Sequence, residues 1–217
     1  MATVVADLTE YAYPSPYFSN NTFNNTKTYN NMAQTATCPE IKDYSAEDLC
    51  FEQMPGMGMN IYPFKKSDLK APLKPTGNKY PTLSTESFLS GKGLYKWVAK
   101  DGTVGQDGEG QGQNKGFKIT FGFEFEAQDE KSAELARSAQ NLDLGYIAKY
   151  GSKWRIIYDP DHKVQFASGG IKCSTGKKSG DENSFSFEAS LEGLTYPYYE
   201  IEEPEGGWDS LLASKKA

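Results

Sequence analysis

The sequence has few of the residues on which most enzyme and metal chemistry depends. Its 217 residues include one histidine, His162, and three cysteines, Cys38, Cys50 and Cys173. The cysteines are odd in number and form no Cys-x-x-Cys pair, so we expect reduced thiols, with a Cys38–Cys50 bridge left as an alternative. A zinc site needs more clustered histidines and cysteines than this, and we expect no cofactor or metal ion.

Long apolar runs and excess positive charge are also missing. No window approaches the 18 apolar residues of a membrane-spanning helix, so no membrane association is expected. Residues 1–10 lack the basic and apolar regions of a secretory signal. The net charge of −6 argues against general nucleic-acid binding, because neutralising phosphates requires a basic surface.

What the sequence does contain is aromatic residues. Hydrophobic residues make up 37% of the chain and aromatic residues 13%, with 14 tyrosines and 12 phenylalanines. Scarce aliphatic and plentiful aromatic side chains are typical of β-strands and interfaces. The apolar material suffices for one core but not for 217 compact residues, so part of the chain is expected to bury itself against a partner.

The composition divides the chain into three regions. Residues 1–90 are polar and interrupted by prolines, which predicts an extended N-terminal arm ordered by partners or, alternatively, a disordered segment. Residues 91–201 are predicted to form a β-rich core, and residues 202–217 a C-terminal tail. The predicted fold is mainly β, of the α+β class: a sandwich- or barrel-like core with one packed helix and long loops.

The strongest local pattern covers residues 117–125. Phe117, Ile119, Phe121, Phe123 and Phe125 alternate with small or polar residues. This period of two predicts a strand with one face in the core. Lys118, Glu124 and Glu126 fall on its polar face.

Helical and hairpin signals follow this strand. Asp129 can cap a helix over residues 130–141, whose alanine-rich stripe favours close packing on a sheet. Gly151-Ser152 is a two-residue turn between predicted strands 145–150 and 153–158. Residues 164–167, 171–174 and 184–191 predict further strands, whereas residues 101–115 predict a loop or the tip of a long hairpin.

Candidate catalytic and metal-binding groups have simpler structural explanations. His162 lies in a predicted turn and could act catalytically only with a partner such as Cys173. Two clusters of acidic residues could bind calcium, but neither matches the EF-hand pattern. A turn in one case and a flexible loop in the other explain the acidic residues. These clusters are Asp159 with Asp161, and Asp101 with Asp107 and Glu109.

Three further patterns are also weak evidence for catalysis or ligand binding. Two carboxylates among Glu124, Glu126 and Glu188 could act as the catalytic pair of a glycosidase, but exposed carboxylates on strands are common. Residues 175–180 lack the first glycine and spacing of a phosphate-binding loop. Aromatic side chains on the predicted strands could stack on sugars, although core or interface packing is the better explanation. These are Tyr95, Trp97, Trp154 and Tyr158. We therefore expect no enzyme activity.

Residues 115–199 resemble virion structural proteins of tailed bacteriophages, especially tail-tube proteins. The resemblance rests on the strand ending at Glu126, the helix near residues 133–141, the hairpin 146–158 and the run STGKKSGDENSFSF at residues 174–187. It covers some 40% of the chain as a pattern of elements. It implies self-assembly into hexameric rings whose strands close a barrel, with DNA passing through the lumen and no catalytic residues.

The resemblance also suggests roles for particular residues. Lys118, Glu124 and Glu126 are expected to line the lumen or a subunit boundary. Lys177 and Lys178, in a polar loop, and the tail residues Trp208, Leu211 and Leu212 are expected to contact neighbouring copies or other virion proteins. Two alternatives stay open: another virion component (head decoration, connector ring or tail terminator) and a carbohydrate-binding β-sandwich.

Overall fold

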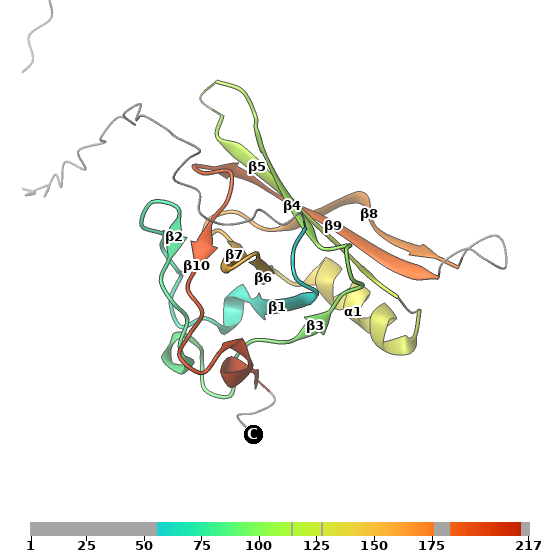
Figure 1. Cartoon of the computed structure of the whole chain (residues 1–217), viewed down its shortest axis with the longest axis horizontal. Helices are drawn as coiled ribbons and strands as arrows, with labels where there is room; N and C mark the ends of the chain where they lie inside the picture. Colours follow the sequence, from blue (N-terminus) through green and yellow to red (C-terminus); the bar gives the residue numbers. More distant parts are fainter. Residues whose placement is uncertain (1–55, 114, 127, 176–182, 214–217) are drawn as a thin grey trace, which may run out of the picture. The chain divides into compact units, whose positions relative to one another are not determined.

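The alternating segment forms β5 (Phe117–Phe125), an inner strand of a four-stranded sheet ordered β4-β5-β9-β8 (Figure 1). The other strands of this sheet are β4 (Gly105–Gly110), β8 (Gln165–Ser174) and β9 (Ser184–Leu194). The structure, a computed structural model, describes residues 56–113, 115–126, 128–175 and 183–213. These residues all belong to the compact unit Leu49–Ala217.

A second sheet, of six strands, is ordered β2-β10-β7-β6-β1-β3. Its central strands are β1 (Asn60–Lys65), β6 (Leu144–Tyr150) and β7 (Lys153–Ile157). Short strands complete it: β2 (Lys79–Tyr80), β3 (Trp97–Val98) and β10 (Glu200–Ile201). Three 3₁₀ turns accompany the sheets: η2 (Lys66–Asp68), η3 (Thr85–Ser87) and η4 (Trp208–Leu211).

The two sheets share an aromatic core. The ring centroids of Phe121 on β5 and Tyr146 on β6 are 5.4 Å apart, and those of Phe123 and Trp97 are 5.9 Å apart. Ile119, Phe121 and Phe123 are at most 1% exposed, as the alternation predicts. The prediction of a mainly β fold with a sandwich-like core is confirmed.

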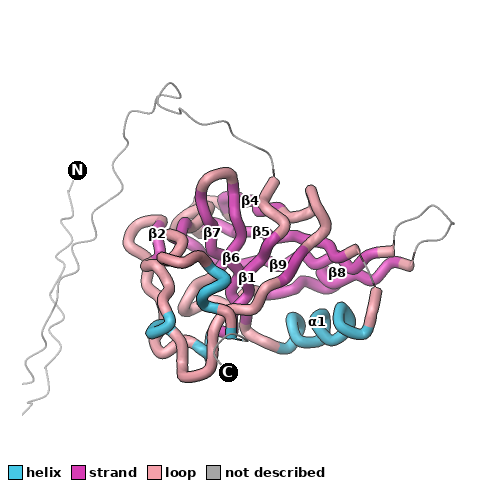
Figure 2. The backbone as a smooth tube through the Cα atoms, turned by 60° about the horizontal axis from the view of Figure 1, so that its bottom comes forward, coloured by secondary structure: helices cyan, strands magenta, loops and turns pink. Residues whose placement is uncertain are grey.

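The predicted helix is also present. Helix α1 spans Glu130–Asn141 and lies alongside β8 (Figure 2). The Asp129 carboxylate accepts a hydrogen bond from the Ser132 backbone N–H at 2.7 Å, and the Ser132 hydroxyl accepts one from the Asp129 N–H. This reciprocal cap fixes the start of the helix. The hydrogen bonds from Ser132 lower the pKa of Asp129, so the cap weakens in acid as that carboxylate takes up a proton.

The predicted boundary at residue 90 is wrong. Strand β1 pairs with β6 from Ile61–Ala148 to Lys65–Leu144, so residues 60–65 form part of the core and not of an arm. Four successive residues of β1, 61–64, are buried, which removes the alternation that marks a half-exposed strand. Pro63 also argued against a strand in the sequence, because proline is rare inside strands. The missing N–H of Pro63 faces the β3 side, where strand pairing stops after Ile61–Trp97.

Residues 66–96 continue to contribute to the core after β1. Buried side chains at irregular spacing pack here: Leu69, Leu73, Tyr80, Leu83, Phe88 and Leu94. The predicted loop at residues 101–115 likewise contains strand β4, one arm of the hairpin with β5. Among the described residues, no helix is both long and apolar enough to cross a membrane.

Buried tyrosines make the fold sensitive to alkali. Burial, followed by a hydrogen bond to Asp209, raises the pKa of Tyr62 from 10.0 to about 12, and burial also raises the pKa of Tyr80 and Tyr146. These side chains hold their protons more tightly when folded. Their stabilising effect is therefore complete below pH 10 and is lost as the pH rises through the folded-state pKa.

We therefore expect cooperative unfolding in the alkaline range, beginning between pH 10 and 12. Circular dichroism and tyrosinate absorbance, followed together during a pH titration, measure it. The part of the tyrosinate absorbance that comes from the buried tyrosines should rise in step with the loss of ellipticity. Full ionisation of the tyrosines near pH 10, with ellipticity unchanged, would contradict this expectation.

Candidate assembly surface

The four-stranded sheet ends in two strands that have no outer strand partner among the described residues. These strands are β4 at one end and β8 at the other. An unpaired strand exposes a row of backbone N–H and C=O groups that can pair with another chain. Among the described residues, the sheet thus has unpaired backbone groups along both of its edges.

The hydrogen-bond pattern shows which groups of β4 face outward. The Gln111 N–H donates to the Gly116 carbonyl at 3.0 Å and closes the β4–β5 hairpin. Because hydrogen-bonded and non-hydrogen-bonded pairs alternate in an antiparallel ladder, Asp107 and Glu109 point their backbone groups toward β5. The backbone groups of the intervening residues, Gln106, Gly108 and Gly110, therefore face the open edge.

The same alternation extends through the sheet to β8. Phe123 pairs with Phe187, and Phe125 with Phe185, through backbone hydrogen bonds, so Ser186 of β9 points its backbone toward β8. Ser186 pairs with Lys172, whose backbone groups thus face inward. The N–H and C=O groups of Cys173, one residue further, face the open edge. Cys173 is an exposed free thiol.

One face of this sheet lies in the core and the other is polar. Lys118 and Glu124 lie on the polar face of β5, where the sequence placed them, and Glu126 follows the strand in an exposed position. Strands β4, β8 and β9 add polar side chains in register with these residues. Those in register are Asp107, Glu109, Gln165, Lys172, Ser186, Glu188 and Ser190, and Glu192 lies beside Lys118 where the β5–β9 register shifts.

The polar face carries more negative than positive charge. Its strands present five carboxylates and two lysines, a formal charge of −3. The Lys118 ammonium lies 3.5 Å from the Glu192 carboxylate, an exposed pair that contributes little to stability. Charge patterning in the sequence identified Glu124 and Glu188 but not Asp107 and Glu109 as part of this face, because β4 was not recognised as a strand.

Two predicted interface residues are buried in the protomer itself. Trp208 is 1% exposed and Leu211 is 3% exposed, and Leu212 packs partly buried against the same core. The predicted role of Trp208 and Leu211 as exposed anchors for a neighbouring copy is therefore wrong. Lys177 and Lys178, along with Cys38 and Cys50, lie outside the described residues.

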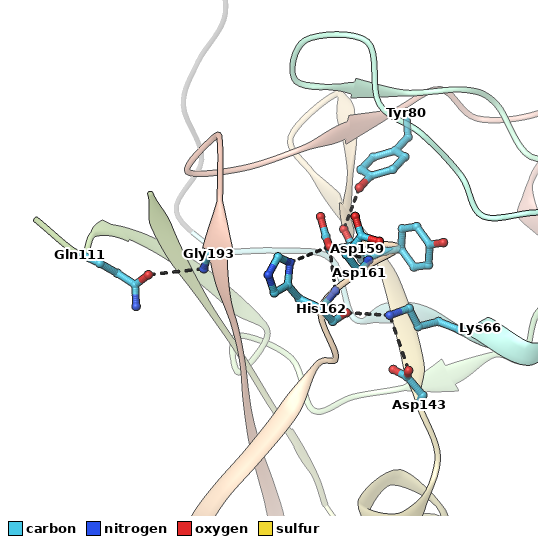
Figure 3. Close-up of polar contacts among 9 residues, drawn as sticks. Lys66, Tyr80, Gln111, Asp143, Asp159, Asp161, His162 and Gly193 are labelled. Carbon is cyan, nitrogen blue, oxygen red and sulfur yellow. Dashed lines mark hydrogen bonds and ion pairs between the residues drawn. The ribbon is translucent and has the colours of Figure 1, made fainter. Parts of the chain in front are cut away.

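The single histidine belongs to a turn (Figure 3). The Asp159 carboxylate accepts hydrogen bonds from the backbone N–H groups of Asp161 and His162 and lies 2.8 Å from His162 Nδ1. Lys66 Nζ donates to the His162 carbonyl at 2.6 Å and lies 3.5 Å from Asp143. These contacts hold the turn between β7 and β8 against the end of β1.

The other candidate ligand groups lie apart or are buried. Across the described ranges, no three His, Cys, Asp or Glu side chains are placed to hold one metal ion. Tyr158 is 2% exposed and lies in the core, so it cannot stack on a sugar beside Trp154. The Trp154 ring packs against Tyr62 and Trp208, and its Nε1 donates to Glu203 at 3.0 Å.

Comparisons with known proteins found no relative of this chain. No family model matches the chain, and neither a curated protein nor a solved structure matches it.

Proposed function

We propose that this protein is a virion structural protein that assembles into rings, stacked as the tail tube of a tailed bacteriophage. The observation that supports the proposal is the four-stranded sheet. It has two open edges, one face in the core and one polar face with a formal charge of −3. Such a sheet can be extended when the edge strand of one copy pairs with the edge strand of the next.

Ring closure follows from pairing β4 of one copy with β8 of the next. Such head-to-tail contacts generate a closed ring when the rotation between copies closes. Closing the four-stranded sheets into a barrel also removes both of their open edges. Six copies of four strands make a barrel of 24 strands. Barrels of roughly 16–18 strands already leave an aqueous channel, so a lumen is expected.

The charge of the polar face suits a channel for DNA. With the core on one side of each sheet, the face bearing Lys118, Glu124 and Glu188 would line the lumen. DNA binds where lysines and arginines neutralise its phosphates. An acidic wall repels the phosphates, so DNA slides along it without being retained.

The decisive experiment is to determine the size and shape of the purified full chain. Light scattering across a concentration series, followed by negative-stain imaging, should show rings or stacked tubes. Rings without stacking would favour a head-decoration, connector or tail-terminator protein. A monomer at every concentration would overturn the proposal, and glycan binding by that monomer would favour the carbohydrate-binding alternative.

Reversing charges on the polar face tests its place in the lumen. The double variant Glu124→Lys, Glu188→Lys changes the formal charge of each face from −3 to +1. We expect assembled rings of this variant to retain duplex DNA in a filter-binding assay at low salt, with retention lost as salt increases. The matched control, Glu134→Lys with Glu205→Lys, changes exposed residues elsewhere and should not retain DNA. Equal retention by both variants would contradict a lumen location.

A further inference from the structure

Negative charge is unevenly distributed along the chain. Residues 1–55 contain seven carboxylates and two lysines, a formal charge of −5 out of the −6 of the whole protein. Residues 40–52 alone hold five of these carboxylates and one lysine. This acidic segment also contains Tyr44, Leu49 and Phe51. It therefore combines charge with apolar side chains that can be buried on binding.

A lysine-lined cavity lies at the far end of the six-stranded sheet from β3. It has a volume of about 540 Å³ and is formed by β2, β7, β10 and the turn between β6 and β7. Four lysines line it: Lys74, Lys79, Lys149 and Lys153. Hydroxyl groups of Thr76, Thr82 and Ser152 add hydrogen-bonding capacity.

The cavity lining carries one more positive than negative charge. Three glutamates also line it: the Glu200 carboxylate lies 3.0 Å from Lys153 Nζ, and Glu203 accepts the Trp154 indole N–H. Lys74 and Lys79 are exposed and have no carboxylate within salt-bridge distance among the described residues. These two ammonium groups are available to an incoming carboxylate.

Four other cavities in the described part of the chain lack this excess of positive charge. One of them, about 590 Å³ between β3 and α1, is lined by three lysines and three carboxylates. The cavity beside His162 is lined by one lysine and two carboxylates. An acidic peptide thus finds favourable charge at the cavity beside β2.

We propose that the lysine-lined cavity binds the acidic segment, residues 40–52, of a neighbouring copy. This inference rests on the proposed assembly, to which it adds a second contact besides the β4–β8 edges. Opposite charges on the two surfaces would fix which copies join and in what orientation. Docking would also offset part of the repulsion between acidic segments in an assembly with many copies.

A disulfide trap tests the contact directly, because Cys50 lies inside the acidic segment. In a full-length background with Cys38→Ser and Cys173→Ser, the substitution Ser152→Cys places a thiol at the rim of the cavity. Oxidation of the assembled protein should give disulfide-linked multimers on a non-reducing gel. The matched control is Ser90→Cys, an exposed residue that lines a different cavity. We expect it to cross-link at least about fivefold less.

Charge reversal then tests whether attraction between lysines and carboxylates guides the contact. Lys74→Glu with Lys79→Glu should lower the cross-linking yield at least about fivefold, because two attractions between exposed charges become repulsions. Adding Glu47→Lys and Asp48→Lys to the same chain should restore the yield. Unrestored cross-linking would show that charge does not guide the contact, and would overturn the proposal.

The outcomes separate this inference from the proposed function. If the protein forms rings or tubes but Ser152→Cys links no better than Ser90→Cys, the inference fails and the assembly stands. Cross-links confined to single chains would overturn the assignment to a neighbouring copy. If the chain remains monomeric at every concentration, the proposed function and the inference fail together.

Discussion

Replacing Cys173 by proline is expected to abolish assembly while leaving the protomer folded. The Cys173 N–H faces the open edge of β8, so its loss removes no hydrogen bond within the protomer. Proline is tolerated on edge strands when its missing N–H faces solvent. At a β4–β8 contact, the same substitution removes a ladder hydrogen bond and places the proline ring against the neighbouring strand. We expect association more than about tenfold weaker, from a loss exceeding about 1.4 kcal/mol at each contact.

Two neighbouring substitutions make the result specific to the edge. Lys172→Pro removes a hydrogen bond to β9 within the protomer, so it should destabilise the fold itself by about 1–3 kcal/mol. Cys173→Ser keeps the backbone N–H and should assemble like the unmodified chain. Light scattering and urea unfolding measure association and stability separately. Normal assembly of Cys173→Pro would show that β8 is not the contact edge.

The clearest sequence signals concerned single elements with one buried face. The alternation in residues 117–125 predicted β5, and Asp129 predicted the start of α1, because each pattern records a local physical requirement. The Gly151-Ser152 turn likewise predicted the β6–β7 hairpin. Such signals depend only on residues close together in the sequence, so they can be recognised from one sequence.

The predictions that failed depended on tertiary contacts. Strand β1 is buried on both faces, so it shows no alternation, and Pro63 interrupts its strand-favouring residues. Strand β4 contains glycines at 105, 108 and 110, which predicted a loop. A Cβ at Gly108 would lie 2.3 Å from the Pro197 carbonyl oxygen, so a side chain is excluded there by a segment nearly 90 residues away. No local pattern could have revealed that contact.

The candidate surface was only partly predictable for the same reason. The polar residues of β5 were identified, but the open edges follow from strand order, which the sequence does not state. Trp208 was misassigned because a short amphipathic segment near the end of the acidic tail resembles an exposed anchor. In the structure, the Leu94 N–H donates to the Leu211 carbonyl and the Ala213 N–H to the Leu94 carbonyl, at 2.9 Å each. These bonds attach the tail to its own core.

Trp208→Ala is therefore expected to destabilise the protomer itself. Trp208 is 1% exposed, and its ring centroid lies 5.6 Å from that of Trp154 and 6.2 Å from that of Tyr62. Truncating a buried tryptophan leaves a cavity that costs about 3–5 kcal/mol. That is a large share of the roughly 5–15 kcal/mol by which most domains are stable. Urea unfolding of the dilute protein should show a much lower midpoint.

Trp208→Phe provides the matched control. Trp208 Nε1 is buried and has no hydrogen-bond partner among the described residues, so phenylalanine loses no hydrogen bond while keeping most of the ring contacts. We expect it to cost less than half as much as alanine, because the remaining cavity is smaller. If Trp208 instead anchored a neighbouring copy, Trp208→Ala would weaken association and leave monomer unfolding unchanged. An unchanged urea midpoint would therefore contradict the burial of this side chain in its own protomer.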